Sequence, residues 1–281
     1  MAYQASFEMI KKAQAGHYAV PAFNAENLEM VQAIIAAAEQ EHSPVMIQTT
    51  MPTVAYLTED EAYAMVYTLA KKADIPVALH LDHCTSFDGV MRAIRAGYSS
   101  VMIDGSKLPF EENLAITRKV VEVARPMGVT VEAELGTVGG KEDNLKSDTV
   151  IYTDVKEAQI FAEQTGVDIF AIAIGTAHGF YKGEPKLDFD RISEIRSVID
   201  TPLVLHGGSG VPEASVKKAI NLGMSKVNFA TELRAAATKA VREALLDSAV
   251  IDPKKFMGPA REAVRQLCIE KIHMCGSENK A

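Results

Sequence analysis

Apolar, β-prone segments alternate with helical segments eight times along this chain, and this alternation restricts the folds that it can adopt. The expected strands cover residues 19–24, 45–49, 75–81, 99–103, 129–135, 168–174, 202–206 and 225–229. No linker rich in proline, glycine or serine divides the series. A strand and helix repeated in this way is the pattern of a parallel sheet that closes into a (β/α)8 TIM barrel.

Segments with helical periodicity separate the expected strands. They cover residues 26–41, 59–73, 86–96, 110–126, 154–165, 189–198 and 212–222. A helix over residues 3–15 would cover the bottom of the barrel, and further helices follow the last strand. We therefore expect an α/β fold in which residues 1–281 form a single TIM barrel with extra terminal helices. A doubly wound open sheet is the alternative, disfavoured because eight consecutive units close naturally.

The composition excludes several classes of partner. At 281 residues, 48% of them hydrophobic, the chain can bury a large core, and its formal net charge of -8 argues against nucleic acid or anionic membrane as a partner. We find no signal-peptide pattern and no apolar run as long as a membrane span, so we expect a cytoplasmic protein. Three widely spaced cysteines, Cys84, Cys268 and Cys275, do not suggest a disulfide framework.

The longest irregular stretch runs from residue 136 to about residue 152 and holds three glycines and mixed charge. A loop of that length in a compact domain is usually a functional lid or a disordered excursion.

Three of the seven histidines lie where expected strands end. His83 follows the third strand, His178 follows the sixth, and His206 ends the seventh. Three imidazoles on one rim of a barrel can bind zinc and leave a fourth position open for substrate. The alternative is a histidine satisfied by hydrogen bonds inside the barrel, an interpretation that suits His80.

Carboxylates also gather at strand ends: Asp82 on the third strand, Asp104 on the fourth, and Glu132 and Glu134 on the fifth. A buried acid is costly unless it is paired or bound to metal, so each of these requires a partner. Glu132 and Glu134 share one face of their strand because side chains repeat every two residues. An ion pair with a core lysine or arginine is the alternative role for each, and for Glu132 the two interpretations weigh equally.

Glycines and hydroxyls follow the seventh and eighth strands, at residues 207–210 and 228–231. Their backbone can approach a phosphate closely, and the loops after these two strands are the usual phosphate site of a TIM barrel. Arg234 could meet a second anionic group, although a solvated surface charge is the alternative.

Several of these segments, in order, resemble the zinc-dependent class II ketose-bisphosphate aldolases nearly end to end. The matching segments are Leu81-Asp82-His83 and residues 100–106, 131–136, 173–179, 203–210, 226–232 and 275–277. The resemblance implies a TIM barrel that forms a homodimer or homotetramer. It also implies reversible cleavage of a ketose 1,6-bisphosphate into dihydroxyacetone phosphate and glyceraldehyde 3-phosphate.

Carried over by position, the resemblance implies a role for each site residue. His83, His178 and His206 would hold the catalytic Zn2+, and Asp104 and Glu134 match residues that hold a second or resting metal position. Asp82 would exchange the C4 hydroxyl proton, and Glu142 would move the proton on the dihydroxyacetone phosphate carbon. The expected substrate-binding residues are Asn24, Gly179, Gly207, Gly208, Ser209, Asn228, Ala230, Thr231 and, for the far phosphate, Arg234. In relatives a monovalent cation, Na+ or K+, often lies beside the nearer phosphate.

The markers of sugar preference conflict. Residues 228–232, with Ala230, resemble tagatose-bisphosphate enzymes, whereas residues 208–210 and 252–259 resemble fructose-bisphosphate enzymes. We expect tagatose 1,6-bisphosphate slightly ahead of fructose 1,6-bisphosphate, or an enzyme that accepts both. Some tagatose-type relatives work with a non-catalytic accessory subunit.

Two other functions are disfavoured. A zinc hydrolase often carries a His-x-His pair on its first strand, which here ends in Phe23-Asn24. A non-catalytic sugar-phosphate-binding barrel predicts the loss of metal ligands or proton-transfer acids, and these residues are all present.

Overall fold

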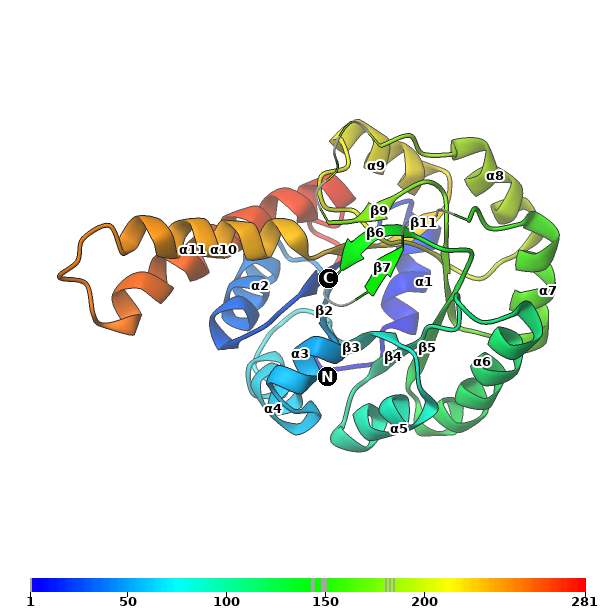
Figure 1. Cartoon of the computed structure of the whole chain (residues 1–281), viewed down its shortest axis with the longest axis horizontal. Helices are drawn as coiled ribbons and strands as arrows, with labels where there is room; N and C mark the ends of the chain where they lie inside the picture. Colours follow the sequence, from blue (N-terminus) through cyan, green and yellow to red (C-terminus); the bar gives the residue numbers. More distant parts are fainter. Residues whose placement is uncertain (1, 143–144, 148–150, 180, 182, 184) are drawn as a thin grey trace.

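A computed structural model describes residues 2–142, 145–147, 151–179, 181, 183 and 185–281, with only the backbone of 141, 142 and 145–147. Eight parallel strands close into a barrel in the order β1-β11-β10-β8-β5-β4-β3-β2 (Figure 1). They are β1 (Val20–Asn24), β2 (Val45–Thr50), β3 (Val77–Cys84), β4 (Ser100–Ile103), β5 (Thr130–Leu135), β8 (Ile169–Ile172), β10 (Leu203–Leu205) and β11 (Met224–Phe229). The barrel confirms the predicted TIM fold.

Helices surround the barrel as the alternation predicts. They are α2 (Leu28–Gln40), α4 (Glu59–Ala70), α5 (Phe87–Ala96), α6 (Phe110–Ala124), α7 (Val155–Thr165), α8 (Phe189–Val198) and α9 (Glu213–Asn221). The side chains of Asn27, Ser86 and Asp154 each accept a backbone hydrogen bond in the first turn of α2, α5 and α7, which caps those helices. A short helix, α3 (Met51–Tyr56), and a 3-10 turn, η1 (Arg125–Met127), were not predicted.

Helix α1 (Phe7–Gly16) contacts β1 and β11 and closes the N-terminal end of the barrel. Its buried Met9, Ile10 and Ala13 belong to the apolar cluster inside the barrel. Just before α1, Ser6 Oγ donates a hydrogen bond of 3.0 Å to Ser100 Oγ of β4. With this end closed, the polar strand ends at the opposite mouth are where a ligand can enter.

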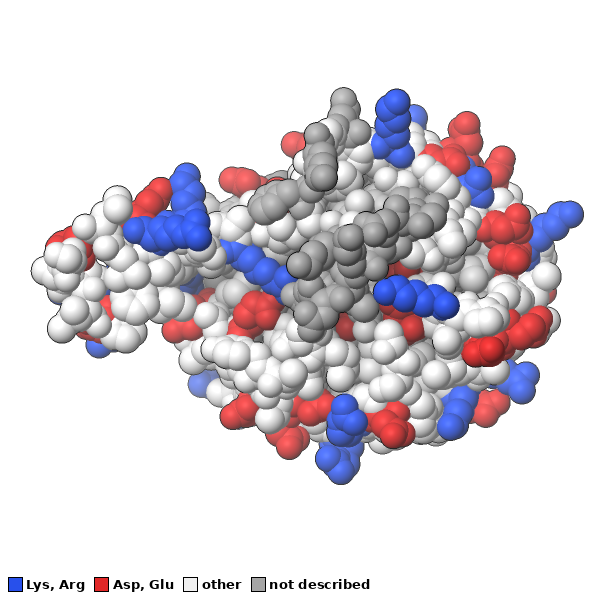
Figure 2. All heavy atoms as spheres, viewed as in Figure 1, with Lys and Arg blue, Asp and Glu red and all other residues white. Residues whose placement is uncertain are grey.

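The expected terminal helices form a long pair, α10 (Thr231–Ala244) and α11 (Pro253–Cys275), which projects from the barrel (Figure 1). α11 packs against α10 and α2. No helix in the described part of the chain is long and apolar enough to cross a membrane. Acidic and basic side chains are interspersed around the rim of the face in Figure 2, as expected for a chain without a broad basic footprint. The three cysteines are buried and unpaired with one another.

The prediction of an irregular stretch over residues 136–152 was wrong in part. β6 (Gly139–Glu142) and β7 (Leu145–Ser147) form an antiparallel hairpin, and β6 also pairs with β9 (Ala177–His178). Gly140 has a φ of +89°, and a side chain there would collide with the backbone of His178. The hairpin escaped prediction because its partner strand lies far along the chain and its residues show no apolar alternation.

We predict that Phe161→Ala destabilises the fold by about 3–5 kcal/mol, because it removes a fully buried ring and leaves a cavity. Phe161 of α7 stacks on Phe170 of β8 with ring centroids 5.3 Å apart. Its neighbour Ile160 is exposed, so Ile160→Ala is the matched control and should change stability by no more than about 0.5 kcal/mol. Urea unfolding measures both, and equal losses would contradict the packing described here.

Candidate active site

Asp82 and His83 lie within β3, which runs past the predicted end at residue 81. The register of β3 against β4 shifts between Leu81 and Cys84, and His83 has a φ of 48°. Successive side chains of a regular strand point to opposite faces, and a bulge re-aims them. This irregularity lets both side chains reach the mouth of the barrel, where Asp82 is 1% exposed and His83 is 5% exposed.

Three histidines from β3, β9 and the end of β10 converge at this mouth. The ring centroid of His83 lies 5.0 Å from that of His178 and 4.6 Å from that of His206. Each residue offers one nitrogen, and these three nitrogens lie within 4.8 Å of one another. The structure therefore brings together the three histidines that the sequence placed on one rim.

The donor set fits a divalent transition metal. His206 Nε2 donates a hydrogen bond of 2.7 Å to Glu132 Oε1. Its other nitrogen, Nδ1, is buried, makes no hydrogen bond with any described residue and lies 3.3 Å from Glu134 Oε2. A buried imidazole nitrogen that has a lone pair once its proton is displaced, beside two further imidazoles, is what zinc and similar ions bind.

Two more groups of residues have metal-binding spacing. His83, Asp104 and Glu134 form one, in which His83 Nδ1 donates to Asp104 Oδ2 at 2.9 Å. Burial raises the pKa of Asp104, but hydrogen bonds from His83 and Ser106 and the charge of His83 lower it by more. The pKa of Asp104 is therefore well below its usual range. His80, Asp82 and Glu132 form the other group. There the ammonium of Lys226, 2.8 Å from Glu132 Oε2, already supplies the cation.

The carboxylates around the histidines hold protons on them. Burial lowers the pKa of His206, but Glu132 and Glu134 raise it more, to about 9. Burial also lowers the pKa of His83, whereas the charges of Asp82 and Asp104 raise it well above the usual value. With a pKa of about 9, His206 carries a proton at neutral pH that an arriving metal ion must displace.

The side-chain amides of Gln48 and Asn228 lie beside the carboxylate of Asp82, and the sequence analysis did not predict Gln48. Gln48 Nε2, from β2, lies 3.0 Å from Asp82 Oδ2 and 2.7 Å from Asn24 Oδ1. Asn228 Nδ2 lies 3.5 Å from Asp82 Oδ1. Gln48 therefore connects two of the predicted site residues, and the signal that could have revealed it is a glutamine inside an otherwise buried strand.

The expected phosphate-binding residues lie together. One pocket is lined by His178, Gly179, Gly207, Ser209, Asn228, Ala230 and Thr231. Ser209 Oγ accepts a hydrogen bond of 3.2 Å from Ala230 N, and Gly208 N donates to Asn228 O at 3.1 Å, which places Gly208 beside the pocket. α10 begins at Thr231, so the N-terminal end of this helix is at the pocket, where backbone N–H groups favour an anion.

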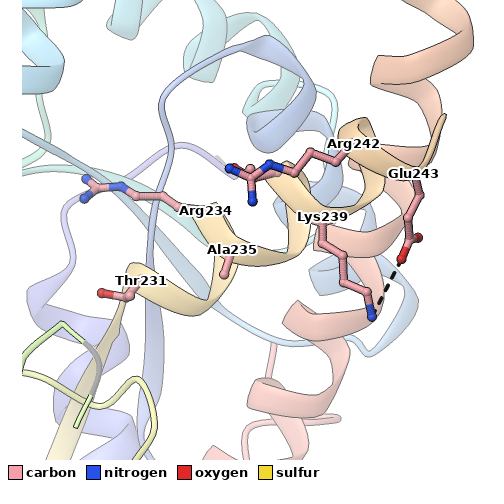
Figure 3. Close-up of a pocket in the computed structure, with 7 residues that line it drawn as sticks. Thr231, Arg234, Ala235, Lys239, Arg242 and Glu243 are labelled. Carbon is pink, nitrogen blue, oxygen red and sulfur yellow. Dashed lines mark ion pairs between the residues drawn. The ribbon is translucent and has the colours of Figure 1, made fainter. Parts of the chain in front are cut away.

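Arg234 lines a second pocket along α10 that shares Thr231 with the first (Figure 3). Its side chain is 30% exposed, and its guanidinium binds Glu26 Oε1 through Nε at 2.7 Å and Nη2 at 2.6 Å. Arg234 is therefore an ion-paired residue next to the phosphate-binding candidates, which differs from the solvated charge considered as the alternative.

Glu142 ends β6, and its side chain lies outside the described part of the structure. Its backbone pairs with Leu145, two residues beyond the Gly140 and His178 pair. Glu142 therefore lies on a strand that pairs with β9, the strand that carries His178.

Comparisons with known proteins agree with this geometry. A family model described as "Fructose-bisphosphate aldolase class-II" matches residues 4–280. A probable fructose-bisphosphate aldolase from Bacillus subtilis (strain 168) is 49% identical over 278 residues, covering 98% of each chain. A fructose-bisphosphate aldolase from Geobacillus stearothermophilus is also 49% identical over 278 residues, covering 98% of this chain and 97% of its own.

Two crystal structures share the fold along nearly the whole chain. The YdjI aldolase from Escherichia coli K12 superimposes with a TM-score of 0.89 at 37% identity and 99% coverage of both chains. A putative fructose-1,6-biphosphate aldolase from Coccidioides immitis gives 0.91 at 28% identity, covering 99% of this chain and 98% of its own. The chain belongs to the class II fructose-bisphosphate aldolase family. It is therefore a lyase of a metal-dependent class.

We predict that metal binding releases protons near neutral pH, because the pKa of His206 is about 9 and a metal takes the deprotonated ring. Metal affinity should then rise with pH up to about 9 and level off above it. Calorimetric titration with Zn2+ in buffers of different ionisation enthalpy measures the proton count. A binding enthalpy that does not depend on the buffer at pH 7.5 would contradict this prediction.

Proposed function

We propose that this protein cleaves fructose 1,6-bisphosphate reversibly into dihydroxyacetone phosphate and glyceraldehyde 3-phosphate. The observation that carries this proposal is the convergence of three histidines and Asp82 at the mouth of a barrel, beside a pocket at a helix N-terminus. The names of the relatives favour fructose over the tagatose sugar that we expected from residues 228–232. Tagatose 1,6-bisphosphate is the second candidate, because Ala230 lines the pocket.

In this proposal His83, His178 and His206 hold a zinc ion, with Asp104 and Glu134 available for a second or resting position. When bound, the ion supplies Lewis-acid stabilisation of the negative charge that develops beside the substrate carbonyl. A Schiff-base lysine fills that role in the other aldolase class. Lys226 lies inside β11 and pairs with Glu132, which supports the metal-dependent route.

Asp82 is the proposed base that takes the C4 hydroxyl proton in cleavage and returns it in condensation. The amides of Gln48 and Asn228 face the two oxygens of its carboxylate and orient it. Glu142 is the proposed acid that moves the proton on the dihydroxyacetone phosphate carbon. Closure of the β6 and β7 hairpin would exclude water from this step.

The proposed site for the first phosphate is the pocket at the start of α10. Its residues are Gly179, Gly207, Ser209, Asn228, Ala230 and Thr231, with Gly208 behind them. We propose that a monovalent cation lies beside this phosphate. In this proposal Asn24 binds the sugar. Arg234 binds the far phosphate after its ion pair with Glu26 breaks. The homodimer or homotetramer, the accessory subunit and the cytoplasmic location stay predictions.

We expect the purified, zinc-loaded protein to cleave fructose 1,6-bisphosphate with a higher kcat/KM than tagatose 1,6-bisphosphate. A coupled assay that detects dihydroxyacetone phosphate measures both, and prior treatment with a chelator should abolish the activity. Asp82→Ala should retain metal and lose cleavage, because it removes the base and leaves all three histidines of the proposed metal centre in the chain. A preference for tagatose would reverse the choice of sugar. Equal rates for wild type and Asp82→Ala would exclude the assigned base.

We expect Glu142→Gln to lower kcat by about 100-fold or more while KM changes little, because the residue acts on the proton transfer. Exchange of the dihydroxyacetone phosphate carbon-bound proton with deuterium, followed by NMR, isolates this step. Glu112→Gln on the exposed start of α6 is a matched control that should behave as wild type. A variant at Glu142 that loses only affinity would assign the proton transfer to a different residue.

A further inference from the structure

Glu132 is a fully buried acid that the proposed mechanism does not use. Both Glu132 and Lys226 have 0% exposed side chains, and Lys226 Nζ donates to Glu132 Oε2 at 2.8 Å. The second oxygen, Oε1, accepts the 2.7 Å hydrogen bond from His206 Nε2. One carboxylate therefore connects a core ammonium to a histidine of the proposed metal centre.

We propose that Glu132, held in place by Lys226, is a positioning residue that makes His206 bind the metal through Nδ1. This inference rests on the proposed role of His206 as a metal ligand. It extends that role by naming the group that selects which nitrogen faces the ion and that fixes the orientation of the ring.

The selection follows from what each group can donate or accept. An ionised carboxylate only accepts hydrogen bonds, so the short contact with Glu132 requires a hydrogen on His206 Nε2. When a metal ion displaces the second proton of the ring, the neutral imidazole keeps this one N–H, and its other nitrogen, Nδ1, has the lone pair that binds the ion. Nδ1 is buried and makes no hydrogen bond to a described residue, and His206 offers one nitrogen to the group of three histidine nitrogens within 4.8 Å. With Nε2 occupied by Glu132, Nδ1 is the nitrogen that remains for that group.

Glu134 also approaches His206, but its position is different. Its Oε2 lies 3.3 Å from Nδ1, and no described residue hydrogen-bonds to that oxygen. Glu132 has the ammonium of Lys226 on one oxygen and the imidazole N–H on the other. Glu134 therefore stands on the metal side of the ring, whereas the neutralised Glu132 stands on the opposite side, where it can orient the ring without competing for the ion.

His80 supplies the remaining contact with Glu132. His80 Nδ1 lies 2.8 Å from Ser100 Oγ, which also accepts a hydrogen bond from Ser6 Oγ. Its Nε2 lies 3.5 Å from Glu132 Oε2 and makes no hydrogen bond with a described residue. Lys226 of β11 and His206 at the end of β10 both donate to Glu132 of β5, so the carboxylate is held from two other strands.

A purely structural role explains these residues poorly. Replacing a buried ion pair by apolar residues of similar volume is often neutral or stabilising, so a fold needs no such pair for stability. A carboxylate beneath a metal-binding histidine fixes its tautomer and raises its basicity, and loss of such a partner typically lowers metal affinity 10-fold to 100-fold.

The test compares zinc affinity of wild type and Glu132→Gln by competition with a chromophoric chelator. We expect a loss of about 10-fold to 100-fold, because glutamine keeps the size of the side chain without the charge. In ¹⁵N-histidine-labelled, zinc-loaded wild type, NMR should show His206 bound through Nδ1 with a hydrogen-bonded Nε2–H. That Nε2–H signal should move and exchange faster in Glu132→Gln.

Ser43→Ala is the control, because it removes a buried hydrogen bond, to Ser277 Oγ, that involves none of Glu132, Lys226, His80 and His206. It should keep wild-type zinc affinity, and an equal loss there would overturn the proposal by showing general loosening. If Glu132→Gln does not fold, Lys226→Met removes only the ammonium and should also weaken zinc binding. Unchanged affinity in a folded variant would overturn the positioning role alone. Failure of wild type to bind zinc at His206 would overturn the proposed metal centre as well.

Discussion

Closure of eight parallel strands is the constraint on which the site depends. Closure places the C-terminal ends of all eight strands around one mouth, so residues far apart in sequence become neighbours. His206 and Glu132, for example, are 74 residues apart and share a 2.7 Å hydrogen bond. α1 fills the opposite end with apolar side chains, and polar chemistry is therefore concentrated at the mouth.

Buried charge is the second constraint, because an uncompensated ion inside a barrel is costly. Two of the acids near the mouth have donors arranged around them: Lys226 and His206 for Glu132, and His83 with Ser106 for Asp104. The same contacts leave the histidines oriented toward one another. The hydrogen bonds that compensate Glu132 and Asp104 are therefore the same ones that orient His206 and His83, two of the proposed metal ligands.

Much of this could be predicted from sequence. The barrel, the terminal helices and the convergence of His83, His178 and His206 followed from strand periodicity and from which residues stand at strand ends. The β6 and β7 hairpin, the role of Gln48 and the position of Lys226 did not follow. Each depends on pairing with a distant segment, such as β9 for the hairpin and β3 for Gln48, and local periodicity carries no information about such partners.

The sequence by itself determined the order of strands and helices and the residue types at the mouth, because both are encoded in local patterns of apolar and polar side chains. Only the tertiary structure decided how Asp82 and His83 could both reach the mouth, since that required a shift in register against β4. It also decided that Glu132 pairs with Lys226 and meets His206 through Nε2. Those outcomes depend on distances between strands, which exist only once the barrel has closed.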